Sequence, residues 1–528
     1  MAVWASNQQS AKLHSISLLH RYGLSFIDLR TLFAFGLPFI LYLLTVAPTL
    51  YSFDSAELTT AAATGGFVHA TGYPLYLMIG WLWSHLPLGD VGYRMNLLSA
   101  FCGSLTIALA DRILRRLKVG SWAAFGALGV LACSTYFWGL SLIAEVYTLH
   151  TALMCGLILL LLAWGDHPTP ARLGAVALLT GVSMGNHMAT VLLIPGCLWY
   201  LVAVSPRHFF TLKSIATAVG AGLLGLSIYL YLPLRYSIAP LPAFNYAGWY
   251  DASGKFFPLD LSSPAGLWWL VSGQAFSAFM FSYSGSSLWP QIEQAGIQLS
   301  QAFFAVGVGP GLLGLVVLLR HNWRLGGMLL LMFLAHTFFY IGYGAGDKKT
   351  MFLPTYLIWA LWLGVGYQWL LIWISQTPVL TLPESTLWCR IKTGQAFNAW
   401  ETGLFRAVIV GLVLLALGWN WSQVNQSNDW RARIRGQTIL TRVEANALVF
   451  GYWDTAPIVQ YLQIVEGQRP DVETINRYLI NDNDMIALIK QEISRRPVYI
   501  DVVPIELLDE VDVEADGVLK RLTWSNTK

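Results

Sequence analysis

The sequence predicts a polytopic α-helical membrane protein with about eleven transmembrane helices and a small soluble α/β domain at the C-terminal end. Two features of the composition support this fold class. The 528-residue chain is 55% hydrophobic and only 12% charged, whereas soluble domains carry roughly 25% charged residues. The charge is also uneven, because 28 of the last 107 residues are charged against 33 of the other 421. A soluble enzyme and a disordered protein are thereby excluded, and the net charge of +3 gives no indication of nucleic-acid binding.

Apolar runs long enough to cross a bilayer recur along the chain. A spanning helix needs about 20 mostly apolar residues. The candidate spans are 31–50, 95–111, 122–142, 147–164, 172–186, 188–204, 214–233, 300–319, 326–344, 350–374 and 404–421. The segment 74–87 is shorter and rich in Trp, which is typical of a helix that lies in the membrane interface.

The Lys and Arg residues of the short loops predict the orientation. Cytoplasmic loops carry an excess of these residues. The basic loops are 112–120, 205–213, 320–325 and 375–405. All four lie on the same side as the N-terminus, so we expect a cytoplasmic N-terminus. Eleven spans then place the C-terminal end on the outward face, which is periplasmic, extracellular or lumenal.

This topology divides the chain into three parts. Residues 1–30 form a cytoplasmic segment, residues 31–421 form the transmembrane domain with outward loops 51–94 and 234–299, and residues 422–528 form the soluble domain. In the soluble part, the patterns predict strands at 446–452, 471–476 and 496–501 and a helix at 455–467. This part lacks a Walker motif, a GxGxxG fingerprint and a nucleophile elbow, so it gives no sign of nucleotide chemistry.

The first outward loop carries two carboxylates in the sequence Tyr51-Ser-Phe-Asp-Ser-Ala-Glu-Leu58. Asp54 and Glu57 are spaced i, i+3, so they share one face of a helix. Carboxylates near membrane depth are costly to bury and are usually paired or functional. The alternative is that they only cap a helix N-terminus, as an acidic variant of the capping box. Spacing alone supports both interpretations.

Other polar residues occur in the same outward plane. His69 and Tyr73 lie in the irregular segment Gly65-Gly-Phe-Val-His-Ala-Thr-Gly-Tyr-Pro-Leu-Tyr76. A lone His such as His69 is more often a structural hydrogen-bonding group than a catalytic one. The remaining candidates for substrate contacts are Glu145, Asn186, His187, Arg235, Asp347, Lys348 and Lys349. Each alone is more often a residue that snorkels to the interface, but Arg and Lys together suit an anionic phosphate. The five cysteines show no CxxC spacing, so the sequence predicts no metal site of that type.

At Asp54-Ser-Ala-Glu57 and His69-Ala-Thr-Gly-Tyr-Pro-Leu-Tyr76 the sequence resembles the DUF2723 family, which looks like a branch of the GT-C glycosyltransferases. That family includes a eukaryotic protein O-mannosyltransferase, transmembrane protein 260. Further similar motifs are Ala144-Glu-Val-Tyr147, Leu232-Pro-Leu-Arg235, the segment from Asp347 to Pro354, and Tyr461-Leu-Gln-Ile-Val-Glu-Gly-Gln-Arg-Pro-Asp471. This chain has Ala70 and Thr71 where the family usually has two prolines.

The resemblance implies a membrane glycosyltransferase that uses a polyprenyl-phosphate sugar, with mannose suggested by the one relative. It implies that Asp54 is the general base and that Glu57 orients the acceptor or the base. Arg235, with Lys348 or Lys349, would neutralise the leaving phosphate. We expect inversion at the anomeric carbon, no metal and no cofactor other than the lipid-linked donor. The acceptor would be a protein, lipid or glycan hydroxyl.

Two other function classes remain open from the sequence. One is a transporter or flippase of a lipid-linked sugar, which would also gather polar groups in a membrane cavity. Its usual inverted repeat with paired broken helices is not visible in the sequence. The other is a non-catalytic assembly protein that uses its C-terminal domain for interactions. Formation of a new glycosidic bond distinguishes the enzyme from both.

Overall fold

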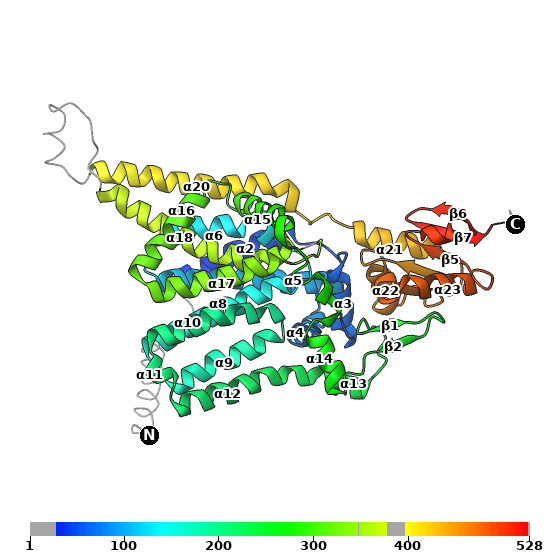
Figure 1. Cartoon of the computed structure of the whole chain (residues 1–528). Coiled ribbons are helices and arrows are strands. Elements are labelled where there is room, and N and C mark those ends of the chain that lie inside the picture. Colours follow the sequence, from blue (N-terminus) through cyan, green and yellow to red (C-terminus); the bar gives the residue numbers. More distant parts are fainter. Residues whose placement is uncertain (1–27, 347, 377–395, 526–528) are drawn as a thin grey trace, which may run out of the picture.

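The computed structural model describes residues 28–346, 348–376 and 396–525. Most of these residues form a bundle of helices, and a small domain with a sheet lies beyond one end of the bundle (Figure 1). The same end of the bundle carries the short helix α3 and the β1–β2 hairpin. The chain is a multi-pass membrane protein.

Eleven apolar helical segments of the described residues account for the predicted spans. Six are long enough to cross a membrane and five are shorter. The long ones are α5 (Val91–Arg116), α8 (Tyr147–Asp166), the continuous run Leu212–Ile238 made of α12 (Leu212–Leu226), η2 (Ser227–Leu230) and α13 (Tyr231–Ile238), α17 (Trp323–Ile341), Thr350–Ile374 in η5 (Thr350–Phe352) and α18 (Leu353–Gln376), and Gly403–Val424 in α20 (Ala396–Val424). The shorter ones are α2 (Leu29–Thr45), α6 (Ser121–Ala132), α9 (Pro170–Met184), Met188–Val204 in η1 (Met188–Leu193) and α10 (Ile194–Val204), and α16 (Val308–His321). The expected number of about eleven is confirmed.

Two of the predicted spans are not continuous helices. The span expected at 300–319 is divided between α15 (Leu288–Ala302) and α16, because Phe304 and Ala305 both adopt φ of 54° and turn the chain. The span expected at 122–142 is divided between α6 and α7 (Thr135–Leu140). Ser134 starts the second piece, since its hydroxyl accepts a hydrogen bond from the Phe137 N–H at 3.4 Å.

The first outward loop folds into α3 (Asp54–Thr64) and α4 (Pro74–Ser84), which pack together. Pro74 suits the first turn of α4, where its missing N–H would have no helical partner. One side of α4 is buried, whereas Trp81 and Leu82 on the other side are 48% and 66% exposed. The segment 74–87 therefore contains a helix with one buried face and one exposed apolar face.

The second outward loop also contains secondary structure. It forms the hairpin of β1 (Gly248–Tyr250) and β2 (Phe256–Pro258), then α14 (Pro264–Val271) and the 3-10 turns η3 (Gln274–Phe279) and η4 (Gly285–Ser287), before α15. Ser263 caps α14 by accepting a hydrogen bond from the Gly266 N–H at 3.1 Å. The segment 234–299 thus contains several ordered elements.

The C-terminal domain is built on a five-stranded sheet with the strand order β4-β3-β5-β7-β6. The predicted strands are found as β3 (Leu448–Gly451), β4 (Glu473–Asn476) and β5 (Val498–Ile500), and the predicted helix as α22 (Ala456–Ile464). β3 pairs in parallel with β4 and β5. The antiparallel hairpin of β6 (Val511–Asp516) and β7 (Leu519–Trp524) was not predicted, and α21 (Arg431–Arg442), η6 (Arg477–Leu479), α23 (Asp482–Glu492) and η7 (Ile505–Leu507) complete the domain.

Hydrogen bonds attach the C-terminal domain to the end of the bundle that carries α3 and the β1–β2 hairpin. The Arg433 guanidinium donates to Asp90 Oδ2 at 2.7 Å and to Thr49 Oγ1 at 2.8 Å. The Gly92 N–H donates to the Tyr461 hydroxyl at 3.2 Å. Buried or partly buried charge-assisted contacts of this kind are strong and directional. The domain therefore has a defined position over the outward loops.

Candidate active site

The start of α3 places both predicted catalytic carboxylates in the interior. Phe53, with φ of 58°, turns the chain into the helix, so Asp54 is its first residue and Glu57 lies one turn further on. Glu57 is fully buried and Asp54 is partly buried. Asp54 Oδ1 accepts a hydrogen bond of 2.6 Å from the indole Nε1 of Trp453. Glu57 Oε1 accepts a 2.7 Å hydrogen bond from the backbone N–H of His69.

The capping alternative for these two carboxylates is wrong. The N-cap position is occupied by Phe53, and no side chain caps the helix there. A capping carboxylate would accept from backbone N–H groups of the first turn. Asp54 and Glu57 instead contact Trp453 and His69, which come from distant parts of the chain.

Glu57 and His69 form a buried pair. Glu57 Oε2 lies 2.7 Å from His69 Nδ1, and the imidazole is only 9% exposed. Burial raises the pKa of Glu57, the proximity of Asp54 raises it further, and His69 opposes the shift. A proton shared between the carboxylate and Nδ1 fixes the orientation of the imidazole ring. The other ring nitrogen, Nε2, then lies 3.3 Å from the Tyr73 hydroxyl.

Tyr73 completes this group as a neutral hydroxyl. Burial raises its pKa well above the usual value, and the charges of Asp54 and Glu57 add to the shift. Its ring lies 5.4 Å from that of His69 and 5.9 Å from that of His187. The hydroxyl can therefore donate or accept a hydrogen bond without becoming charged.

Asp54, Glu57 and His69 also have the ligand types of a cation site. Their nearest donor atoms all lie within 4.8 Å of one another. Both oxygens of Glu57 already face hydrogen-bonding groups of His69. The absence of a metal requirement stays a prediction.

The candidates at the ends of spans lie close to the same group. The Asn186 side-chain amide donates to the Val146 carbonyl at 3.1 Å, which joins the α8 and α9 ends. His187 Nδ1 accepts from the Ala189 N–H at 3.1 Å. Glu145 is 9% exposed, and its charge contributes, as one of the smaller effects, to the raised pKa of Tyr73.

Two of the predicted cations donate hydrogen bonds to protein oxygens. Arg235 Nε donates to the Gly65 carbonyl at 2.8 Å, so the guanidinium caps the C-terminal end of α3, away from Asp54 at its N-terminal end. Lys348 Nζ donates to Gln291 Oε1 at 2.7 Å and to the Tyr343 carbonyl at 3.0 Å. Lys349 is exposed. Asp347 lies outside the described residues.

Sequence reasoning missed the aromatic residues that surround His69 and Asp54. The Trp453 ring lies 5.4 Å from that of His69, and Phe276 lies 5.6 Å from it on another element. Tyr246 and Tyr478 contact Trp453 at 5.4 and 5.0 Å. One partial signal was present, because Trp453 directly follows the predicted strand 446–452. The structure shows that this strand pairs in parallel with its neighbours, and site residues gather at the C-terminal ends of such strands in α/β sheets.

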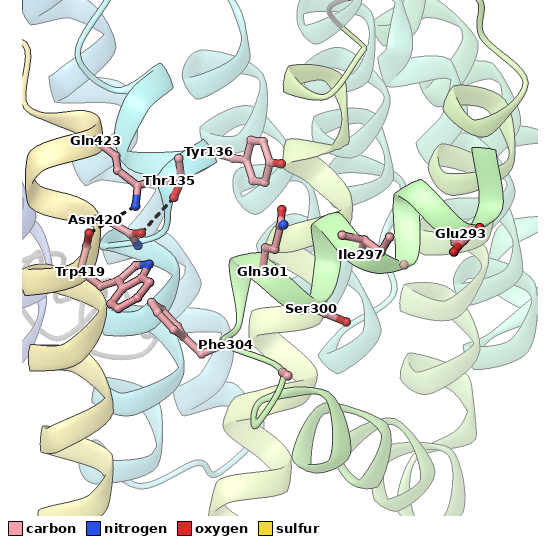
Figure 2. Close-up of a pocket in the computed structure, with 12 residues that line it drawn as sticks. Thr135, Tyr136, Glu293, Ile297, Ser300, Gln301, Phe304, Trp419, Asn420 and Gln423 are labelled. Atoms are coloured by element: carbon pink, nitrogen blue, oxygen red, sulfur yellow. Dashed lines mark hydrogen bonds between the residues drawn. The ribbon is translucent and has the colours of Figure 1, made fainter. Parts of the chain in front are cut away.

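Two cavities have linings that include residues of the described bundle. The smaller cavity has a volume of about 240 Å³ and is lined by Tyr51–Phe53, Asp429, Arg431, Arg435 and Asp454. Two of these residues, Phe53 and Asp454, are the sequence neighbours of Asp54 and Trp453. A larger groove of about 810 Å³ runs between α15, α7 and α20 (Figure 2). Its lining includes Gln301, Phe304, Trp419 and Asn420 and none of the predicted site residues.

The helical membrane bundle, with a small α/β domain docked over the loop that carries Asp54 and Glu57, has the GT-C fold. Solved structures with the same fold include ArnT from Cupriavidus metallidurans bound to undecaprenyl phosphate. The TM-score is 0.53 at 12% identity, over 94% of this chain and 98% of that one. The apo state of the same protein matches with the same TM-score and identity.

Residues 54–208 match the family described as the protein O-mannosyl-transferase TMEM260 N-terminal domain. Protein O-mannosyl-transferase TMEM260 of Mus musculus is 33% identical over 203 residues, which are 37% of this chain and 28% of that protein. Its namesake from Dictyostelium discoideum is 22% identical over 479 residues, which are 84% of this chain and 56% of that protein. The matches thus span about half or less of these relatives. The resemblance expected from the motifs is confirmed, and the matched region begins at Asp54.

Proposed function

We propose that this protein is an integral membrane glycosyltransferase that transfers a sugar from a polyprenyl-phosphate donor to an acceptor hydroxyl on the outward face. The GT-C fold and the names of the relatives support the reaction class. The observation that carries the proposal is the position of Asp54, at the entry to α3 with one oxygen held by Trp453 and beside the buried Glu57–His69 pair.

Asp54 is the proposed general base. It accepts the proton of the acceptor hydroxyl while the acceptor oxygen forms a bond to the anomeric carbon. The bond between that carbon and the donor phosphate breaks, and the polyprenyl phosphate leaves with the electron pair. Direct attack inverts the anomeric configuration, and this scheme uses neither a metal nor another cofactor. Glu57 orients His69, and His69 with Tyr73 faces the substrate.

The leaving phosphate requires positive charge nearby. Arg235, Lys348 and Lys349 are the proposed sources. Arg235 and Lys348 donate to protein oxygens in this structure, whereas Lys349 is exposed. Lys349 is therefore the proposed first contact for the phosphate of an incoming lipid-linked donor. Glu145, Asn186 and His187 are proposed to contact the sugar or the acceptor.

The relatives suggest mannose as the sugar and a protein hydroxyl as the acceptor. The proposed partners are thus the lipid-linked donor, the acceptor and the surrounding membrane lipids. The outward loops and the C-terminal domain would face the periplasm, the cell exterior or an organelle lumen.

The test is sugar transfer by the purified protein in liposomes with radiolabelled polyprenyl-phosphate mannose and a Ser/Thr-rich peptide. Asp54→Asn removes the base, and we expect transfer to fall by about 10² or more, the usual contribution of general base catalysis. Asp260→Asn is the matched control, because Asp260 is an exposed carboxylate of the second outward loop. We expect it to retain wild-type transfer.

Asp54→Asn with undiminished transfer would contradict the assignment of the base. Label that crosses the bilayer without forming a glycosidic bond would indicate a transporter instead. Neither transfer nor transport, with binding of other membrane proteins, would indicate an assembly protein.

A further inference from the structure

Trp453 brings the C-terminal domain into direct contact with the candidate base. It lies just after β3, and its indole N–H donates to Asp54 Oδ1 at 2.6 Å across 399 residues of sequence. A hydrogen bond to an ionised carboxylate is charge-assisted and has a preferred direction. The indole N–H therefore constrains which way the Asp54 carboxylate faces.

The indole itself is held by several neighbours. Its ring lies 5.0 Å from Tyr478, 5.4 Å from Tyr246 and 5.4 Å from His69, all in edge-to-face arrangements. Edge-to-face pairs of this kind are favourable beyond the area that they bury. Tyr246 is fixed in turn, because its buried hydroxyl donates to Gln460 Oε1 of α22 at 2.6 Å. The indole thus has a defined orientation rather than a freely rotating one.

The domain that carries Trp453 is anchored independently of it. Arg433 of α21 binds Asp90, and Tyr461 of α22 accepts from Gly92, both on the bundle. Loss of the Trp453 N–H therefore removes one hydrogen bond at the site without removing these contacts. This separation makes the contribution of Trp453 measurable.

We propose that Trp453 is a positioning residue for the glycosyl transfer: its N–H occupies Oδ1 of Asp54 and leaves Oδ2 as the oxygen that takes the acceptor proton. The C-terminal domain is then part of the catalytic apparatus, because it supplies the group that orients the base. This inference rests on the proposed function of Asp54.

The experiment compares three new variants with the wild type and with Asp54→Asn in the liposome transfer assay. Trp453→Phe keeps the ring and removes the N–H. Trp524→Phe is the matched control, since Trp524 in the same domain donates its indole N–H to Ser494 at 2.8 Å. The third variant combines Trp453→Phe with Asp54→Asn. Thermal unfolding of each variant is measured in the same detergent.

We expect Trp453→Phe to lower kcat by about tenfold to a hundredfold, the range typical of one hydrogen bond to a charged group. The KM values for donor and acceptor and the Tm should match those of Trp524→Phe. In the Asp54→Asn background, Trp453→Phe should cause no further loss, because residues that act through one another are not additive.

Three results would overturn the inference. Equal kcat for Trp453→Phe and Trp524→Phe would show that the N–H does not position the base. If Trp453→Phe lowered kcat by the same factor in the wild type and in Asp54→Asn, Trp453 would act on something other than the Asp54 carboxylate. A wild-type protein that transfers no sugar would overturn the proposed function as well, whereas the first two results leave that function intact.

Discussion

At the scale of single residues, burial gives the candidate site its chemistry. The i, i+3 spacing of Asp54 and Glu57 was visible in the sequence, and so was their separation from other charges. Their different environments were not visible. Glu57 is enclosed and paired with His69, whereas Asp54 meets an indole N–H and remains partly exposed. The two carboxylates are thus suited to different tasks, orientation for Glu57 and proton transfer for Asp54.

The buried Glu57 predicts a pH-dependent stability. Its pKa is raised above the ordinary value of 4.5, so the folded protein binds this proton more tightly than the unfolded chain. The contribution of Glu57 to stability is therefore complete below pH 4.5 and is lost as the pH rises through its folded value. The Tm of the wild type minus that of Glu57→Gln should be largest below pH 4.5 and should shrink at higher pH. Thermal unfolding across pH measures this difference.

The control for that measurement is Glu506→Gln, which changes an exposed carboxylate of the C-terminal domain. Its Tm should follow the wild type at every pH. Parallel curves for wild type and Glu57→Gln would show that Glu57 has the same proton affinity in the folded and unfolded states.

At the scale of elements, hydropathy identified the spans because a helix in lipid must satisfy its own backbone and present apolar side chains. The break between α15 and α16 lies at Phe304 and Ala305, which both adopt positive φ although neither is a glycine. The turn-forming residues Gly307, Gly309 and Pro310 follow directly, inside the apolar run 300–319 that predicted one span.

The β6–β7 hairpin was not predicted, although β6 alternates apolar and charged residues and Asp516-Gly517 at the turn is a typical hairpin signal. Five of the twelve strand residues are charged, and β7 shows no such alternation.

The end of α3 gives a testable prediction about helix termination. Gly65 has φ of 65° at the C-cap, and a Cβ there would lie 2.8 Å from Arg235 Nε. Gly65→Ala therefore imposes a left-handed conformation on alanine and displaces the capping guanidinium. We expect it to lower the free energy of unfolding by about 1–2 kcal/mol, measured by denaturation in detergent.

Gly36→Ala is the control for this substitution. Gly36 lies within α2, and a Cβ there would meet nothing within 4 Å. Alanine favours a helix over glycine, so this variant should be neutral or slightly more stable. Equal loss in both variants would mean that the α3 cap is not the cause.

At the scale of the whole molecule, the orientation inferred from the basic loops places the C-terminal domain on the outward face. Cys389 lies in the basic loop 375–405, and the C-terminal domain has no native cysteine. Glu506→Cys adds one at an exposed position of that domain. In intact cells or sealed right-side-out vesicles, a membrane-impermeant maleimide should label the introduced thiol of this variant, and Cys389 only after permeabilisation.

The wild type provides the control for the labelling, because it should react only after permeabilisation. Its cysteines at 102, 133, 155 and 197 are buried. Labelling of Cys389 before permeabilisation would reverse the proposed orientation and would place the candidate site on the cytoplasmic face.

The sequence by itself determined the membrane class, the number of spans, the first carboxylate pair and three strands of the C-terminal domain. These features follow from composition and from periodicity within short stretches of sequence, so neighbouring residues are enough to predict them. Only the tertiary structure decided that Arg235 caps α3 and that Trp453 binds Asp54. These contacts join residues 170 and 399 positions apart. They form only when separate elements pack against one another, and short stretches of sequence contain no information about that packing.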